Sequence, residues 1–469
     1  MKLNEKIISA LCVLSLLPYL ALPASANSAQ HDWKGRDESG VVIMDGDCPL
    51  VVEHETLTFD LHEFPAYRNY NESELESYTG RVSAEYTFYN PSDLTVTARM
   101  AFPLTDTYQS YAGQFEDYQI TVNGEVVEAQ MRHTVSKYNE KFDVDTDLPH
   151  LKDEYITDDF FTSGDMTVTK YVMTMPFFEG GEYWGGARCG IDIDPADYPN
   201  TMFYFPNRVS CNILDDGTYR AYSGRVRSYN TITYYTIGEA PSTLPTFNVY
   251  YDWHCNDDEV LARGSKVEKV EALTLNDLIF MDYDESSDVS RMDWYNANLE
   301  ILMERRMAKS PFAYISDFTR RTSYNTYNLL VWYCYEVTVG PGERIVNKVS
   351  APMYPDVNTS NKIAKYTYTY LLSPAGTWAD FGDLDIYVNT PYYLSKSSLG
   401  DFEKTENGYE LHLDGLPKDE SGEYKELTFM LKTEPTRMEK SADGVKSIFN
   451  AIGAFFKRII EFFRNIFTK

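Results

Sequence analysis

The chain of 469 residues carries 71 acidic and 42 basic side chains, which gives a formal charge of −29 at pH 7. This balance excludes the usual nucleic-acid binders, because a phosphate backbone is bound by releasing its counterions onto lysine and arginine. A chain of this length can bury a sizeable core, and it favours two or more domains.

The N-terminal segment, residues 1–26, has the features of a secretion signal in their usual order. Lys2 and Lys6 precede an apolar stretch from Ile7 to Leu22, and small residues lead up to an expected cleavage after Ala26. The stretch is short for a transmembrane helix, which needs about 20 apolar residues. The sequence therefore predicts a protein that is secreted or lies on the extracellular face of the cell envelope, with an uncleaved anchor as the alternative.

A first hairpin is predicted where apolar and polar residues alternate in two successive runs. The runs extend from Val82 to Phe88 and from Leu94 to Phe102, with the turn Asn90-Pro91-Ser92-Asp93 between them. Alternation with a period of two is typical of half-buried strands. The short turn predicts that the two strands pair with each other.

A second hairpin is predicted at Asn123-Gly124. These two residues can take the positive φ angles of a type I′ turn. With them as the loop, Ile120 falls opposite Val127 and Tyr118 falls opposite Ala129, so that apolar residues meet on one face.

Further along the chain, one helix and a second group of strands are predicted. Apolar residues at helical spacing from Met292 to Met303 follow Asp288 or Ser290 as a possible cap, and Pro311 ends the helix. From Tyr327 onward the alternation returns at intervals typical of a β-sandwich.

These patterns predict a mainly β fold of two Ig-like antiparallel β-sandwich domains, with a partly helical middle segment and a C-terminal amphipathic helix. The predicted division is 1–26 signal peptide, 27–79 leader and first strands, 80–265 first sandwich with insertions, 266–320 helical connector, 321–435 second sandwich, and 441–469 amphipathic basic helix.

The cysteines after the signal are odd in number and show no C-x-x-C spacing: Cys48, Cys189, Cys211, Cys255 and Cys334. A bridge such as Cys189 to Cys211 is one possibility in an oxidising exterior. Buried thiols in a protein held together by its core are the favoured alternative.

The C-terminal segment 441–469 combines a large apolar face with a basic face, which suits a helix lying in a lipid interface. Folding back onto the acidic body and self-association are the alternatives. The expected membrane contacts are Phe449, Ile452, Phe455, Phe456, Ile459, Phe463, Ile466, Phe467, Lys457, Arg458 and Arg464.

Two weaker patterns suggest ligands. Asp143, Asp145, Asp147 and Glu154 match positions 1, 3, 5 and 12 of a calcium loop, but Leu148 stands where the loop needs glycine, so a solvated acidic loop is the alternative. Calcium is the one cofactor that the sequence suggests. Trp184, between glycine-rich turns, could stack on a sugar through an exposed ring, with packing in the core or across strands as the alternative.

The sequence contains no H-E-x-x-H, nucleophile elbow, P-loop or dinucleotide fingerprint. It therefore favours a non-enzymatic binding or structural role, with the membrane surface and a glycan or protein ligand as partners. An extracellular carbohydrate-binding module, or a hydrolase whose site forms only in the folded chain, is the alternative.

Three stretches carry a resemblance to a family. They are Tyr86 to Asp93 leading to Ala101-Phe102-Pro103-Leu104, Phe115 to Gly124, and Tyr370 to Trp378 continuing to Tyr393. Together with the Phe-rich tail, they resemble an uncharacterised family of exported β-rich proteins of Gram-positive bacteria. The resemblance implies a cell-surface or secreted protein, and it assigns no catalytic residue.

Overall fold

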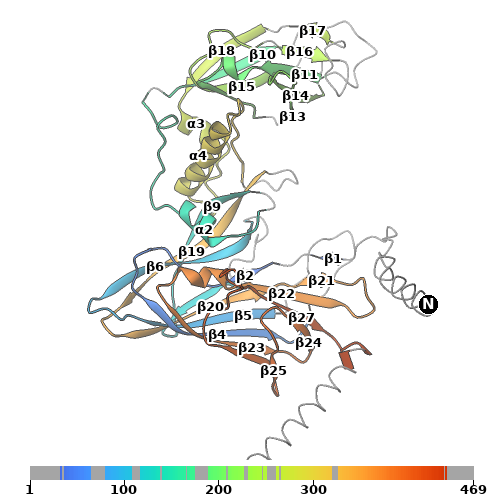
Figure 1. Cartoon of the computed structure of the whole chain (residues 1–469). Helices are drawn as coiled ribbons and strands as arrows, with labels where there is room; N and C mark the ends of the chain where they lie inside the picture. Colours follow the sequence, from blue (N-terminus) through green and yellow to red (C-terminus); the bar gives the residue numbers. More distant parts are fainter. Residues whose placement is uncertain are drawn as a thin grey trace, which may run out of the picture.

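The computed structural model describes residues 32–33, 36–64, 80–107, 117–137, 140–164, 166–174, 188–206, 210–225, 231–245, 247–250, 260–263, 266–318, 326–437 and 439–440. The protein is mainly β, with several sheets of mostly antiparallel strands, which confirms the mainly β part of the predicted fold class. The strands gather into two lobes, and helix α4 (Arg291–Met307) lies between them (Figure 1).

The lower lobe contains three sheets. The largest has the strand order β25 (Glu403–Lys404), β26 (Gly408–Leu413), β23 (Phe381–Asn389), β4 (Val51–Leu61), β5 (Gly80–Tyr89), β20 (Arg344–Met353), β7 (Gln119–Val122) and β8 (Glu125–Val126). A second follows the order β1 (Asp32–Trp33), β21 (Asp356–Asn358), β22 (Lys365–Leu371), β27 (Leu427–Lys432) and β24 (Tyr393–Ser397), with β2 (Glu38–Ser39) also paired to β22. The third consists of β3 (Val42–Ile43), β6 (Val96–Thr107), β19 (Tyr327–Val339) and β9 (Gln130–Lys137).

The core of the lower lobe lies between these sheets. Alternate residues of β4 point inward, and Phe59 meets Phe429 of the facing sheet edge-on, with ring centroids 5.0 Å apart. The pair of β23 and β4 is parallel, as is the pair of β2 and β22. The short 3₁₀ helix η7 (Ser373–Thr377) lies beside β3.

The upper lobe is a sandwich of two smaller sheets. One has the order β12 (Thr201–Tyr204), β15 (Thr231–Gly238), β10 (Val168–Thr174) and β18 (Lys266–Leu273). The other has the order β13 (Ser210–Ile213), β14 (Tyr219–Arg225), β11 (Arg188–Ile193), β16 (Phe247–Tyr250) and β17 (Val260–Arg263), and the short helix η5 (Pro195–Asp197) follows β11. Tyr171 of β10 and Tyr234 of β15 stand opposite each other in the first sheet, and their rings stack in the core between the two sheets with centroids 5.1 Å apart.

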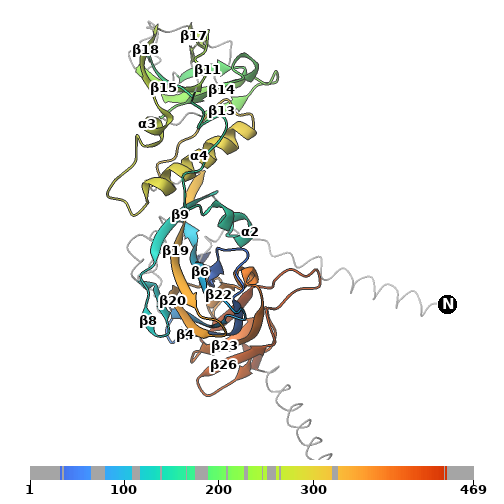
Figure 2. The same ribbon diagram turned by 90° about the vertical axis from the view of Figure 1, so that its left-hand side faces the viewer.

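Helix α4 forms where the sequence predicts it. The Ser290 hydroxyl accepts a hydrogen bond from the Asp293 amide at 3.0 Å, the geometry of an N-cap. Trp294 and Leu299 are fully buried and pack with the first sheet of the upper lobe. The shorter helices α2 (Val144–Asp147) and η4 (Leu148–His150) lie beneath α4, and α3 (Leu275–Ile279) packs against its N-terminal part; α2 and α3 are labelled in Figure 2.

The strand pairing differs from the predicted division of the chain into domains. Strand β19 pairs with both β6 and β9, so residues 80–137 and 327–432 share one lobe. The upper lobe is inserted between β9 and β19, which are adjacent strands. The predicted boundaries 80–265 and 321–435 followed the chain order, and alternation along one strand carries no information about its distant partner.

The predicted hairpin of β5 and β6 is wrong. β5 pairs with β4 and β20, whereas β6 pairs with β3 and β19, so the two strands lie in different sheets. Their apolar faces coincide because both point into the same core. The side-chain amide of the buried Asn90 donates to the carbonyl oxygens of Leu94 and Val339, at 2.7 and 3.0 Å, and so holds the crossing between the sheets.

The hairpin at Asn123-Gly124 is confirmed. Asn123 has φ 50° and Gly124 has φ 83°, and the Val127 amide donates to the Ile120 carbonyl at 3.0 Å, as the predicted register requires. The Asn123 side chain also accepts a hydrogen bond from the Val346 amide at 2.9 Å, which docks the turn on β20.

The suggested bridge between Cys189 and Cys211 is absent, since Cys48, Cys211 and Cys334 carry free thiols. Cys189 lies on β11 and Cys211 on β13, with β14 between them. Strands two places apart in a sheet are separated by about 9.5 Å, beyond the Cα spacing of a disulfide.

A bulge in β4 decides which side chains of this strand face the core. The pairing with β5 shifts by one residue between Val52 and His54. As a result Glu55 is buried while His54 is directed to the outer face. Gly382 on β23 fits the bulge, because a Cβ atom there would lie 2.2 Å from the Glu53 carbonyl oxygen.

Candidate functional site

A buried ion pair fixes helix α4 on strand β9 where the lobes meet. The Arg132 guanidinium contacts the Asp293 carboxylate at 3.0 Å, and the two side chains are 4% and 2% exposed. The same carboxylate accepts a hydrogen bond from the His133 amide at 2.9 Å, and Arg132 also bridges to Asp153 at 2.9 Å. Burial is the largest single effect and acts to raise the pKa of Asp293, but the hydrogen bonds and charges of His133 and Arg132 together outweigh it and lower that pKa.

Below the C-terminal half of α4 the surface is hollowed into a groove. Its volume is about 730 Å³, and its walls are α4, the end of β9, the segment through α2 and the start of β19. Figure 2 shows β9 and α2 beneath α4. The residues that line this α4 groove are Val135, Ser136, Lys137, Glu140, Lys141, Asp143, Thr146, Asp147, His150, Glu300, Ile301, Met303, Glu304, Met307 and Tyr327.

Acidic side chains outnumber basic ones in the α4 groove. The carboxylates are those of Glu140, Asp143, Asp147, Glu300 and Glu304, and they face the two lysines Lys137 and Lys141. Lys137 pairs with Glu304 at 3.1 Å, and His150 pairs with Glu300 at 2.8 Å. The five carboxylates thus outnumber the two lysines by three. The electrostatic field in the groove therefore favours a cation.

Neighbouring groups shift several pKa values in the groove. The hydrogen bond to Glu300 raises the pKa of His150. Burial raises the pKa of Asp147, and burial together with the charge of Glu304 raises the pKa of Tyr327 to about 12. Tyr327 is therefore a neutral hydroxyl at physiological pH, and the carboxylates of α4 carry the charge that a ligand would meet.

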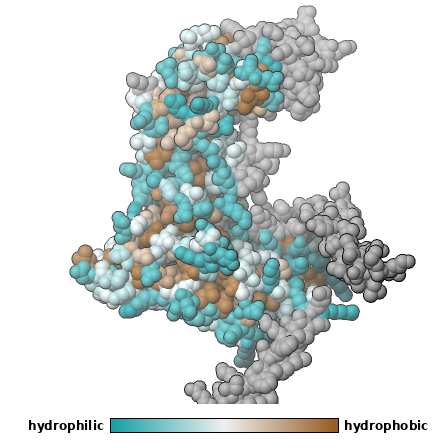
Figure 3. Space-filling view, viewed as in Figure 1, coloured by the Kyte–Doolittle hydropathy of each residue, from teal (hydrophilic) through white to brown (hydrophobic). Residues whose placement is uncertain are grey.

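The groove also has an apolar part. Met307 is 76% exposed at the end of α4, and the partly buried Val135 and Met303 pack near it against the core under the helix. Elsewhere the face seen in Figure 3 is largely hydrophilic, with small scattered apolar patches. The arrangement can hold a ligand that joins a cationic group to an apolar body.

Two of the predicted calcium ligands, Asp143 and Asp147, line this groove and lie at the two ends of a short helical turn. Residues 144–147 make one turn of helix, capped by the Asp143 carboxylate, which accepts from the Asp145 amide at 2.9 Å. Asp147 accepts in turn from the Asp143 amide at 2.8 Å. Both carboxylates thus bind backbone.

Among the described residues, the ligand atoms that gather closely enough for one metal ion belong to a different set, Asp383, His412 and Asp414. Trp184 and the predicted membrane contacts of the C-terminal segment lie outside the described residues. Within the described part of the chain, no helix has the length and apolar content required to cross a membrane.

Sequence patterns did not reveal the groove, because its walls come from segments about 150 positions apart. One signal was present within the helix. Glu300 and Glu304 are four residues apart on α4, and like charges at this spacing destabilise a helix. Such a pair suggests that the charges serve a contact outside the helix.

Comparison with known proteins gives no family. No family model matches the chain, and no curated protein matches it. A crystal structure described as a "putative nutrient binding protein" from Legionella pneumophila is similar over 85% of this chain and 72% of that one, with 11% identity and a TM-score of 0.31. A similarity at this level carries no argument about fold or function.

Proposed function

We propose that this protein is an exported binding protein whose α4 groove takes a cationic ligand with an apolar body. The excess of carboxylates over lysines beside an apolar wall carries the proposal. In this arrangement Glu300 and Glu304 bind an ammonium or guanidinium group, while Met303 and Met307 contact the apolar part. The proposed activity is binding, and no bond of the ligand is broken.

The two glutamates contribute differently. The side chain of Glu300 is 16% exposed and that of Glu304 is 40% exposed. Two unit charges 4 Å apart attract by about 4 kcal/mol in the effective dielectric near a protein surface and by about 1 kcal/mol in bulk water. Glu300 is therefore the stronger anchor, although its pairing with His150 offsets part of the gain.

Binding of a model amine tests this proposal. We expect phenethylamine to bind the full chain with a dissociation constant on the order of 1 mM, a value typical of a ligand of this small size. Its anionic counterpart 3-phenylpropanoate should not bind, because it meets repulsion from the carboxylates. Isothermal titration calorimetry distinguishes the two.

The matched variants are Glu300→Gln with Glu304→Gln, and Glu336→Gln on an exposed position of β19 as the control. The double variant should lose amine binding by about tenfold or more, equivalent to about 1.4 kcal/mol. The control should bind as the parent protein does. Equal binding of amine and carboxylate would count against the proposal.

Amine binding is expected to strengthen as the pH rises through the pKa of His150. The hydrogen bond to Glu300 raises that pKa above its usual value, so His150 keeps its proton to a higher pH than an unperturbed histidine does. Once His150 is neutral, Glu300 is available to the amine. From below that pKa to above it, the affinity should rise about twofold to threefold, the strength of an exposed ion pair. Titrations in buffers of different ionisation enthalpy should detect proton release, and the Glu300→Gln variant should show neither effect.

Export and membrane contact belong to the same proposal. They are supported by the signal-like residues 1–26, by the resemblance to exported proteins and by the amphipathic pattern of residues 441–469. The five basic side chains of that segment could add up to roughly 5 kcal/mol on an anionic surface, at about 1 kcal/mol each.

Removal of residues 441–469 is expected to abolish co-flotation with vesicles that contain phosphatidylglycerol. Vesicles of phosphatidylcholine alone should retain the full chain less well, because the basic face gains nothing there. If the truncated chain floats as well as the full chain, membrane contact through this segment is wrong.

A further inference from the structure

A cluster of metal-ligating side chains lies on the outer face of the largest sheet, far along the chain from the α4 groove. In the antiparallel pair of β23 and β26, Asp385 stands opposite His412, and Leu384 stands opposite Leu413. The same register brings Asp383 and Asp414 together. Side chains two residues apart on a strand share a face. Four side chains on this face therefore lie at the corners of a square: Asp383 and Asp385 of β23, His412 of β26, and Asp414 directly after that strand.

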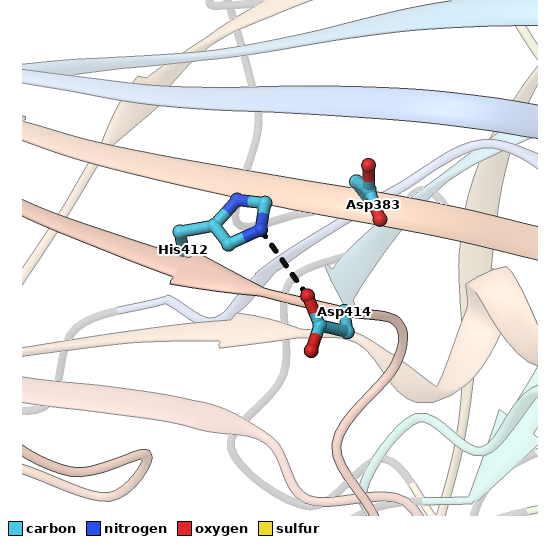
Figure 4. Close-up of side chains that lie close together, drawn as sticks. All are labelled: Asp383, His412 and Asp414. Atoms are coloured by element: carbon cyan, nitrogen blue, oxygen red, sulfur yellow. Dashed lines mark ion pairs between the residues drawn. The ribbon is translucent and has the colours of Figure 1, made fainter. Parts of the chain in front are cut away.

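The atoms that could bind a metal are close. One ligand atom each of Asp383, His412 and Asp414 lies within 4.8 Å of the others. Figure 4 shows the His412 ring beside Asp414, with Asp383 alongside from the neighbouring strand, and Nε2 of His412 lies 3.3 Å from Asp414. Bonds of 2.0–2.2 Å to a tetrahedral ion place ligand atoms about 3.3 Å apart, so small side-chain rotations would bring these three ligand atoms to the distances of a metal site. The Asp414 side chain is 98% exposed and is free to rotate in this way.

The fourth member of the square orients the imidazole. Nδ1 of His412 lies 2.7 Å from a carboxylate oxygen of Asp385. Because an ionised carboxylate only accepts, Nδ1 carries the proton of this bond, and Nε2 is directed at Asp383 and Asp414. Metal-bound histidines in proteins almost always donate their second nitrogen to such a partner.

Asp385 is itself held in place from its other side. Nε2 of His54 lies 3.4 Å from its second carboxylate oxygen and 3.1 Å from the Thr56 hydroxyl. His54 reaches this face because of the bulge in β4, which Gly382 accommodates. The bulge that turns Glu55 into the core therefore also places His54 beside Asp385.

The surroundings are acidic. Asp401, Glu403 and Glu410 line a hollow of about 370 Å³ that also contains Asp385 and His412. No lysine or arginine lines this hollow among the described residues. A concentration of carboxylates raises the local concentration of cations.

We propose that Asp383, His412 and Asp414 bind a divalent transition-metal ion of the zinc class, with Asp385 as the positioning residue. An imidazole with two carboxylates suits such an ion, whereas calcium and magnesium prefer oxygen ligands alone. Three protein ligands leave a coordination position for water or for a group of a partner molecule. The ion would also join β23 to β26 near the edge of the sheet.

Zinc titration of the full chain, first stripped of metal with a chelator, tests the site. We expect Zn²⁺ to bind by calorimetry and Co²⁺ to give the visible absorption of a site with a nitrogen ligand, while Ca²⁺ and Mg²⁺ bind far more weakly. The variant His412→Gln should lose this binding. Asp414→Asn, at a nearly fully exposed position, should weaken it without affecting the fold.

The positioning role of Asp385 has its own readout. Asp385→Asn should weaken Zn²⁺ binding by about 10-fold to 100-fold while the Co²⁺ spectrum keeps its nitrogen ligand. His62→Gln removes an exposed histidine elsewhere and should leave binding unchanged. Unaltered Zn²⁺ affinity of the His412→Gln variant, or no Zn²⁺ binding by the parent chain, would overturn the proposal.

Discussion

Replacement of Asp293 by alanine is expected to lower the free energy of unfolding by about 3–5 kcal/mol, the usual cost of leaving a buried charge without its partner. The variant leaves the Arg132 guanidinium, 4% exposed, without its buried partner, and the half-exposed Asp153 is the carboxylate that remains beside it. It also removes the acceptor of the His133 amide. Urea unfolding of the full chain measures the loss.

The matched control is Asp288→Ala, which removes an exposed carboxylate shortly before α4. Its effect should stay within about 0.5 kcal/mol, as for surface substitutions in general. Replacing both partners, with Arg132→Met and Asp293→Leu, should restore much of the stability, because no unpaired charge remains. A loss below about 1 kcal/mol in the Asp293→Ala variant would mean that this pair does not fix α4 on β9.

The second large effect concerns Glu55 in the core of the lower lobe. Its side chain is 1% exposed, and no basic side chain forms an ion pair with it among the ion pairs of the described residues. Burial raises its pKa to about 8, while the nearby Tyr86 hydroxyl acts in the opposite direction. The folded chain therefore holds a proton here at physiological pH.

This raised pKa makes stability depend on pH in a defined direction. The protonated Glu55 contributes to the free energy of unfolding. This contribution is fully present below the pKa that Glu55 has in the unfolded chain, and it is lost as the pH rises to about 8. Across that interval the loss amounts to about 4–5 kcal/mol, since each pKa unit corresponds to about 1.4 kcal/mol. Glu55→Gln removes the titration, and the variant should be more stable than the parent by a few kcal/mol at about pH 8 and nearly equal to it at about pH 4.5.

Unfolding curves at the two pH values measure this difference. Glu85→Gln, at an exposed position of the neighbouring strand β5, serves as the control and should show little pH dependence of its effect. A Glu55→Gln variant that is less stable than the parent at high pH would show that the ionised carboxylate is accommodated in the core.

Local features of the fold could be predicted from the sequence where the signal and the structure involve the same few residues. The turn at Asn123-Gly124 depends on two φ angles, and helix α4 depends on its cap Ser290 and on the spacing of its own apolar side chains. The strand pairing of β5 and β6 could not be predicted in this way. Both strands face one core, and alternation is the same whether two strands pair or lie on opposite sheets.

The candidate sites were harder to predict for the same reason. The α4 groove joins β9 to a helix far along the chain, and the square of Asp383, Asp385, His412 and Asp414 depends on the register of β23 against β26. The calcium pattern at Asp143 to Glu154 is local and stays a prediction, and its carboxylates also have local backbone partners. A one-turn helix uses Asp143 and Asp147 to cap its own backbone.

A crystal structure of the protein with phenethylamine would show directly whether the α4 groove binds amines. We expect the ammonium nitrogen about 3 Å from the carboxylate of Glu300, the distance of a charge-assisted hydrogen bond, and the phenyl ring against Met303 and Met307. An amine bound elsewhere on the protein, with the α4 groove filled only by water, would contradict this proposal.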